Sequence, residues 1–129
     1  MTSELARLSS NLALASCMVA VTVSMHFWGL MLLTRAVSGG GRRLRAHEGH
    51  GRAGLVILLG VFGVFALHTA EIWSYAALYQ VLGEVRAFTN TLYFSTTAFA
   101  SLGFGNVMLS PRWRLISAIE AANGVILFT

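Results

Sequence analysis

The chain has 129 residues, of which 56% are apolar and only 11% are charged. This composition excludes an ordinary water-soluble domain and indicates a membrane protein. The net charge of +4 does not indicate a nucleic-acid partner, because most of it comes from one short segment. A lone chain of this length can bury little polar backbone without partners, so we expect it to form an oligomer in the lipid bilayer.

The first apolar segment runs from about Asn11 to Thr34, which is long enough for one helical crossing. A cleaved signal peptide has a basic start and a shorter apolar core, whereas here Glu4 balances Arg7. Residues 14–17, Leu-Ala-Ser-Cys, resemble a lipoprotein cleavage box, but the apolar run continues well past them. We therefore expect a helix that is retained.

The segment from Arg35 to Arg52 carries five arginines, two histidines, one glutamate and a run of glycines, which predicts a mobile polar loop. Arginine-rich loops face the cytoplasm, so the N-terminus is expected outside. His47 and His50 in this loop are better explained by solvation than by a metal site. The protein is expected in the plasma membrane, most simply a bacterial inner membrane.

A second apolar segment, from Ala53 to about Leu82, is expected to run outward. The stretch from Gly83 to Ser110 would then lie on the outer side, and a third membrane-spanning helix would begin near Pro111. None of these segments has an arginine at every third residue, so we expect no voltage sensor of the usual kind.

Between the second and third spans, residues 89–99 predict a helix of about ten residues, capped by Thr89 or Asn90. A helix this short must dip into the membrane and return. Non-helical backbone at that depth is tolerated only where it is buried in protein or lines an aqueous path. Gly103 and Gly105 permit backbone conformations that turn successive carbonyl oxygens toward one axis, which would form a cation site.

Residues 101–106 read Ser-Leu-Gly-Phe-Gly-Asn. With the flanking segments they resemble the tetrameric potassium-channel pore, whose filter is Thr-Val-Gly-Tyr-Gly-Asp in most members. The filter is most similar to the Ser-Val-Gly-Phe-Gly-Asn of ether-à-go-go-related channels. The resemblance implies an all-α membrane protein with three transmembrane helices and one re-entrant pore helix, assembled as a homotetramer. Residues 54–129 would be the pore module, and residues 1–53 an additional helix and basic cytoplasmic loop.

The function implied is a potassium-selective channel that conducts K⁺ passively, with K⁺ ions in the filter, no organic cofactor and no enzymatic activity. The implied ion-binding residues are Ser101, Leu102, Gly103, Phe104 and Gly105. The implied filter supports are Ser95, Thr97, Asn106 and Glu120, and Gly124 falls where the family often has a gating hinge.

Several positions depart from the family pattern, among them Ala98 and Ala100, where relatives often have threonines. Thr97 and Asn106 stand where many relatives have an acidic pair that braces the filter, and Phe104 lacks the tyrosine hydroxyl. Fewer hydrogen bonds would hold this filter open, so we expect it to be prone to collapse. A weakly selective or inactivated cation channel is therefore an alternative.

A polar or ionisable side chain inside a membrane span costs free energy unless another polar group pairs with it. His68 and Glu71 share one helix face, and His26 lies at a similar depth in the first span. These three residues predict either a metal or proton site or, as the favoured interpretation, a hydrogen-bonded clamp. A non-conducting metal-binding or scaffold subunit is a second alternative. Glu120 is expected to reach Thr97, the second span or Asn123, in a structural role.

Overall fold

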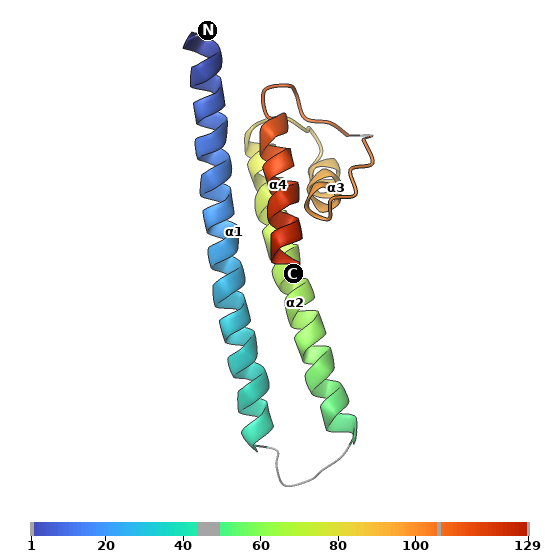
Figure 1. The fold of residues 1–129 in the computed structure, drawn as a ribbon. Coiled ribbons are helices and arrows are strands. Elements are labelled where there is room, and N and C mark those ends of the chain that lie inside the picture. The colour runs from blue at the N-terminus through green and yellow to red at the C-terminus, as the bar shows by residue number, and fades with distance from the viewer. Residues whose placement is uncertain (1, 44–49, 106, 129) are drawn as a thin grey trace.

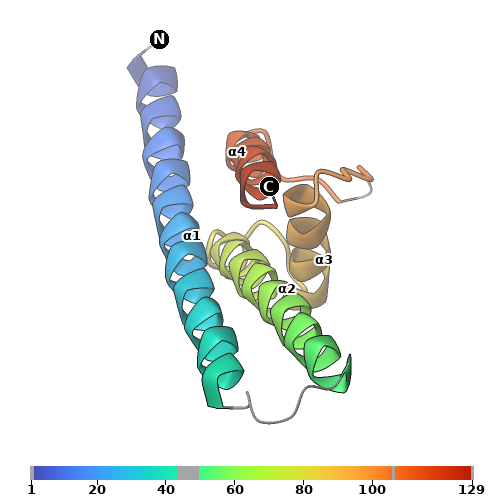
Figure 2. The same ribbon diagram turned by 60° about the horizontal axis from the view of Figure 1, so that its bottom comes forward.

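The computed structural model describes residues 2–43, 50–105 and 107–128. Within these ranges the chain forms four helices, α1 (Thr2–Arg43), α2 (His50–Val81), α3 (Phe88–Phe99) and α4 (Arg114–Leu127). Figure 1 shows α1 and α2 as two long antiparallel helices, with the shorter α3 and α4 beside one half of α2. In Figure 2, α2 and α4 both lie between α1 and α3, and each of these outer helices contacts both of them.

Two of the helices are long and apolar enough to cross a membrane, over Glu4–Ser38 and Gly54–Val81. Only 6% and 11% of the residues in their most apolar windows are buried, so neither behaves as the core helix of a soluble domain. The all-helical membrane architecture predicted from the sequence is therefore supported. α4 has 14 residues, and a third crossing stays a prediction.

Both long helices extend beyond the predicted apolar segments. α1 continues to Arg43 and α2 begins at His50, so the prediction of a polar loop over Arg35–Arg52 is wrong at both of its ends. A helix that has already formed gains one hydrogen bond for each residue added, and arginine is a good helix former. The middle of that predicted loop, including His47, lies outside the described residues.

Glycines allow α1 and α2 to approach each other closely. A Cβ atom at Gly29 would lie 2.4 Å from Leu67 Cδ1, and one at Gly63 would lie 2.4 Å from Leu33 Cδ1. Each helix thus offers a glycine and, four residues later, a leucine that packs over the glycine of the other helix. Small residues serve the same purpose at many helix contacts in membranes.

Two hydrogen bonds tie α1 to α4 and the turn before it. The Asn11 side-chain amide donates to the carbonyl oxygen of Arg112, and the Asn123 amide donates to Thr22 Oγ1 at 2.8 Å. These contacts lie about three turns apart along α1. The first helix is therefore attached to α4 and the preceding turn at two points along its length.

α4 lies unusually close to the end of α3. A Cβ atom at Gly124 would be only 2.0 Å from the carbonyl oxygen of Phe99 and 2.8 Å from its carbonyl carbon. Both atoms belong to the backbone, so the contact cannot be relieved by a side-chain rotation. Gly124 is therefore required by helix packing, and a gating hinge at this position stays a prediction.

We expect Gly124→Ala to destabilise the protein by about 1–3 kcal/mol, the usual cost of overpacking. The free energy of unfolding can be measured in detergent micelles by titration with SDS. Gly60→Ala is the matched control, because a Cβ atom at Gly60 meets nothing within 4 Å and alanine favours the helix. Equal stability of the two variants would contradict the packing role of Gly124.

Candidate functional site

The amino end of α3 differs from the prediction. α3 begins at Phe88 after Ala87, whose side chain makes no cap, so the prediction of Thr89 or Asn90 as the cap is wrong. The extended Ala87 instead accepts hydrogen bonds through its carbonyl oxygen from the N–H groups of Asn90 and Thr91. The Thr91 hydroxyl lies 3.0 Å from Gln80 Oε1 of α2. This contact with α2 lies in the first turn of α3. Because a side-chain cap contributes only about 1 kcal/mol, such a contact can determine where the helix begins.

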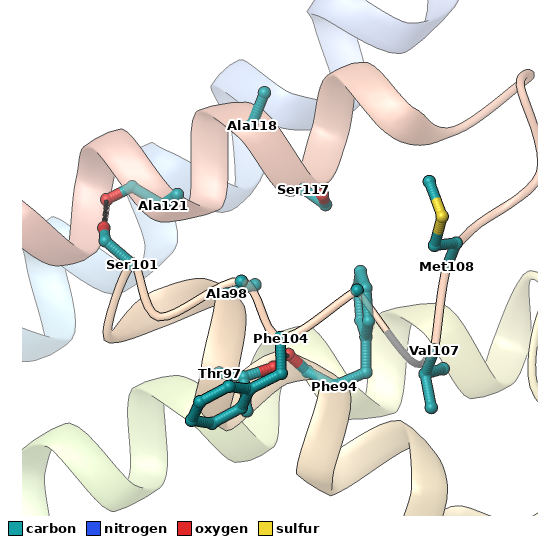
Figure 3. A pocket seen from close by; sticks show the side chains of 12 residues that line it. Phe94, Thr97, Ala98, Ser101, Phe104, Val107, Met108, Ser117, Ala118 and Ala121 are labelled. Carbon is teal, nitrogen blue, oxygen red and sulfur yellow. Dashed lines mark hydrogen bonds between the residues drawn. The ribbon is translucent and has the colours of Figure 1, made fainter.

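The carboxyl end of α3 closes in a Schellman motif. The N–H groups of Ser101 and Leu102 donate to the carbonyl oxygens of Ala98 and Thr97, each at 2.8 Å. The motif requires a left-handed residue at Ser101, which has φ +57°, and glycine is the usual residue there. The motif reverses the chain, and the following residues run back alongside α3 (Figure 3).

Backbone conformation alternates through this returning segment. Ser101, Gly103 and Gly105 have φ values of +57°, +53° and +72°, whereas Leu102 and Phe104 between them do not have positive φ. In an extended strand successive carbonyl groups point to opposite sides. Left-handed residues that alternate with residues of negative φ instead turn successive peptide groups toward the same side. We call residues 101–105 the filter loop.

A cavity of about 300 Å³ lies between the filter loop, α3 and α4 (Figure 3). Its lining residues are Phe94, Thr97, Ala98, Ser101, Gly103, Phe104, Gly105, Val107, Met108, Ser117, Ala118 and Ala121. None of these lining residues has a charged side chain. The Ser101 hydroxyl donates across the cavity edge to the Ala121 carbonyl oxygen at 3.3 Å, whereas the Phe104 ring points away from α4.

The segment that follows the filter loop is anchored to the end of α2. Glu84 accepts two hydrogen bonds from Ser110, one from its backbone N–H at 2.7 Å and one from its hydroxyl at 2.9 Å. The return path is therefore fixed at both ends, by the Schellman motif and by this carboxylate. Sequence reasoning missed Glu84. Asn106 lies outside the described residues.

A buried carboxylate joins α2, α3 and α4 behind the filter loop. Glu120 of α4 is fully buried and accepts hydrogen bonds from the hydroxyls of Tyr79 and Ser95, each at 2.5 Å. The Ser95 hydroxyl also lies 2.9 Å from the Ile72 carbonyl oxygen. Glu120 thus reaches α2, one of the three predicted destinations. The hydroxyl of Thr97 donates within α3 instead, and the Asn123 amide donates to Thr22 and Tyr75.

A second buried carboxylate lies between α1 and α2. Glu71 Oε1 is 2.9 Å from His26 Nδ1, and Glu71 Oε2 is 2.9 Å from His68 Nδ1. The two imidazole centroids are 5.4 Å apart. The structure therefore brings His26, His68 and Glu71 together, as the sequence predicts. None of the three lines the cavity at the filter loop.

A protein family described as an ion channel matches residues 54–129. The chain belongs to this ion-channel family. No curated protein and no solved structure matches the chain. The matched region begins in the first turns of α2 and includes α3, the filter loop and α4, so α1 lies outside the part that defines the family.

Within this ion-channel domain, the structure gathers Ser101, Gly103 and Gly105 in one loop and places Ser95 and Glu120 together behind it. Sequence reasoning missed Tyr79, which donates to Glu120. The available signal was weak, because Tyr79 lies 41 residues before Glu120 and only the packing of α2 on α4 brings them together. The roles of these residues in conduction stay predictions.

We expect Tyr79→Phe to destabilise the channel domain by about 1–3 kcal/mol, because it deprives a buried carboxylate of one hydrogen-bond donor. Thermal or SDS unfolding in micelles measures this loss. Tyr75→Phe is the control, since it removes a hydroxyl one turn earlier on α2 whose contact with Asn123 is longer, at 3.4 Å. A larger loss in Tyr75→Phe than in Tyr79→Phe would refute the assignment.

Proposed function

We propose that this chain is one subunit of a homotetrameric, potassium-selective channel that conducts K⁺ passively across a membrane. The observation that carries the proposal is the φ alternation at Ser101, Gly103 and Gly105, directly after a short capped helix, in a chain that belongs to an ion-channel family. A filter needs carbonyl oxygens that converge on one axis. The alternation of φ along residues 101–105 can turn successive carbonyl oxygens toward such an axis.

Conduction requires four copies. Rings of carbonyl oxygens from four loops replace the hydration shell of the ion, and one filter loop supplies a quarter of each ring. The carbonyl groups of residues 101–104, with the Ser101 hydroxyl at the inner end, would contribute these oxygens. Gly105 would complete the loop. Selectivity then depends on the geometry and dipoles of the backbone, consistent with a cavity that has no charged lining.

The electrostatics of α3 favour a cation near its carboxyl end. Aligned peptide dipoles place partial negative charge at the last turn of a helix. Four copies of α3 pointing toward one axis would concentrate this charge below the filter. The cation would be stabilised there without a formal negative charge.

The exposed surface of a single chain supports assembly with further copies. Leu102 and Phe104 of the filter loop are 59% and 64% exposed. On α4, Ala118, Ala122 and Val125 are exposed at helical spacing along one face. Large apolar side chains beside a loop of polar backbone would be covered by neighbouring subunits in a tetramer. The small residues of α4 would leave room for an aqueous path.

The proposed topology places α1, α2 and α4 across the plasma membrane, with α3 re-entrant. The arginines of residues 35–52, most of which belong to the adjoining ends of α1 and α2, would lie in the cytoplasm and the N-terminus outside. The weakly selective alternative is favoured by one feature, the phenyl ring of Phe104, which cannot donate the hydrogen bond that a tyrosine would.

Rubidium uptake into liposomes tests the proposal. We expect barium-sensitive uptake by the wild-type protein that exceeds sodium uptake, and loss of uptake in Gly103→Ala. Gly83→Ala is the matched control, because both glycines have positive φ and open space around an added Cβ atom, so the two substitutions introduce similar backbone strain. Equal losses in both variants, or no uptake by the wild type, would overturn the proposal. Equal sodium and rubidium uptake would favour weak selectivity.

We further expect the current to decline slowly when external K⁺ is lowered, because ions that leave the filter remove the charge that holds its carbonyl groups in place. Single-channel recording in planar bilayers measures the decline. Phe104→Tyr should slow it by restoring a hydroxyl donor. A steady wild-type current in low K⁺ would show that the filter is braced by other contacts.

A further inference from the structure

The cluster of His26, His68 and Glu71, here called the His-Glu cluster, is unusual for a membrane interior. Glu71 is fully buried, and the His26 and His68 side chains are only 15% and 10% exposed. Three groups that can bind a metal therefore converge where α1 meets α2. Ionisable residues in this environment are costly, and their presence there points to a function.

We propose that the His-Glu cluster binds a divalent transition-metal ion, with Zn²⁺ as the best fit, and so joins α1 to α2 through the metal. One ligand atom from each residue lies within 4.8 Å of the other two. Ligands of tetrahedral Zn²⁺ lie about 2.0–2.2 Å from the ion, and hence about 3.4 Å from one another. The widest pair needs to close by only about 1.4 Å, which side-chain rotation can supply.

The donor set selects the class of ion. Two imidazole nitrogens and one carboxylate form the same set that holds Zn²⁺ at sites with an open fourth position. Imidazole suits zinc, copper and nickel, whereas magnesium and calcium prefer oxygen ligands throughout. A water molecule or an anion would occupy the fourth position.

The protons and charges balance without an additional reactant. An ionised Glu71 only accepts hydrogen bonds, so each imidazole donates its Nδ1–H to one carboxylate oxygen. When the ion binds, two Nδ1–metal bonds and one oxygen–metal bond form, and both hydrogen bonds break. The proton of each ring moves from Nδ1 to Nε2, so the imidazoles stay neutral. The carboxylate compensates one of the two positive charges of the ion.

The position of the cluster connects it to the pore-forming region. The His68 ring lies 4.4 Å from the Phe128 ring at the end of α4, and Phe128 lies 5.6 Å from Phe99 at the end of α3. Phe99 is the residue that packs on Gly124. A bound ion would hold the His68 ring in place and would therefore stiffen this junction. The binding proposal itself does not depend on conduction.

Titration of the full-length, metal-stripped protein with Co²⁺ in detergent tests the site, because tetrahedral Co²⁺ gives intense visible absorption and Zn²⁺ then displaces it. We expect one ion per chain. His26→Asn and His68→Asn should each weaken binding at least about a hundredfold, since even substitutions outside the ligand shell cost 10–100-fold. Asparagine places an N–H donor where Nδ1 stands, so the hydrogen bond to Glu71 is kept while the metal ligand is lost.

The chain offers a matched control in its other two histidines. The double variant His47→Ala/His50→Ala should bind the ion as the wild type does. Zn²⁺ should raise the unfolding temperature of the wild type and of this control, but not of the asparagine variants. Binding that is lost in the control, or that is unchanged in both asparagine variants, would overturn the proposal. The absence of tetrahedral absorption in the wild type would do so too and would leave a hydrogen-bonded clamp.

Discussion

Helices in a bilayer gain little by burying apolar side chains against one another, because lipid tails are equally apolar, so buried polar groups and close packing must hold them together. Among the described residues, polar contacts join all four pairs of helices that pack on each other, namely α1 with α2, α1 with α4, α3 with α2 and α3 with α4. Glu120 with Tyr79 and Ser95 joins α4 to α2 and α3, and Glu71 with the two histidines joins α2 to α1. No side-chain nitrogen or oxygen buried within the described ranges lacks a hydrogen-bond partner.

The geometry of the filter loop depends on these contacts between the helices. The carboxyl end of α3 is held by the Schellman motif at Ser101 and by the close approach of Gly124 to Phe99. Because Glu120 fixes the same helix through Ser95, a shift of α4 would move α3 and the start of the loop together. This coupling gives a physical route by which a movement of α4 can reach the filter loop.

The additional helix α1 is an integral part of the structure. It meets α2 through reciprocal glycine and leucine contacts and through the His-Glu cluster, and it meets α4 through the Thr22–Asn123 hydrogen bond. Although the family match excludes it, α1 therefore packs on both α2 and α4 of the matched region. A metal ion in the His-Glu cluster would act where α1 meets α2, at residues that do not line the cavity beside the filter loop.

Local chemistry was sufficient to predict the class of protein, the apolar helices and the glycines of the filter loop. Each of these features can be recognised from neighbouring residues alone. The patterns are an apolar run long enough to cross a bilayer, a short helical segment and a pair of glycines, and their interpretation does not depend on distant parts of the chain. The pairing of His26 with His68 and Glu71 was also accessible, because buried ionisable groups in lipid must find one another.

The tertiary structure alone decided where the helices end, which residue Glu120 binds and why Gly124 is a glycine. A helix boundary such as Arg43 or Phe88 depends on the balance between helix extension and distant contacts, and this balance leaves no local pattern. The partners Tyr79 and Glu120, and likewise Phe99 and Gly124, are separated by tens of residues. Only the three-dimensional packing of α2, α3 and α4 sets the distances between them.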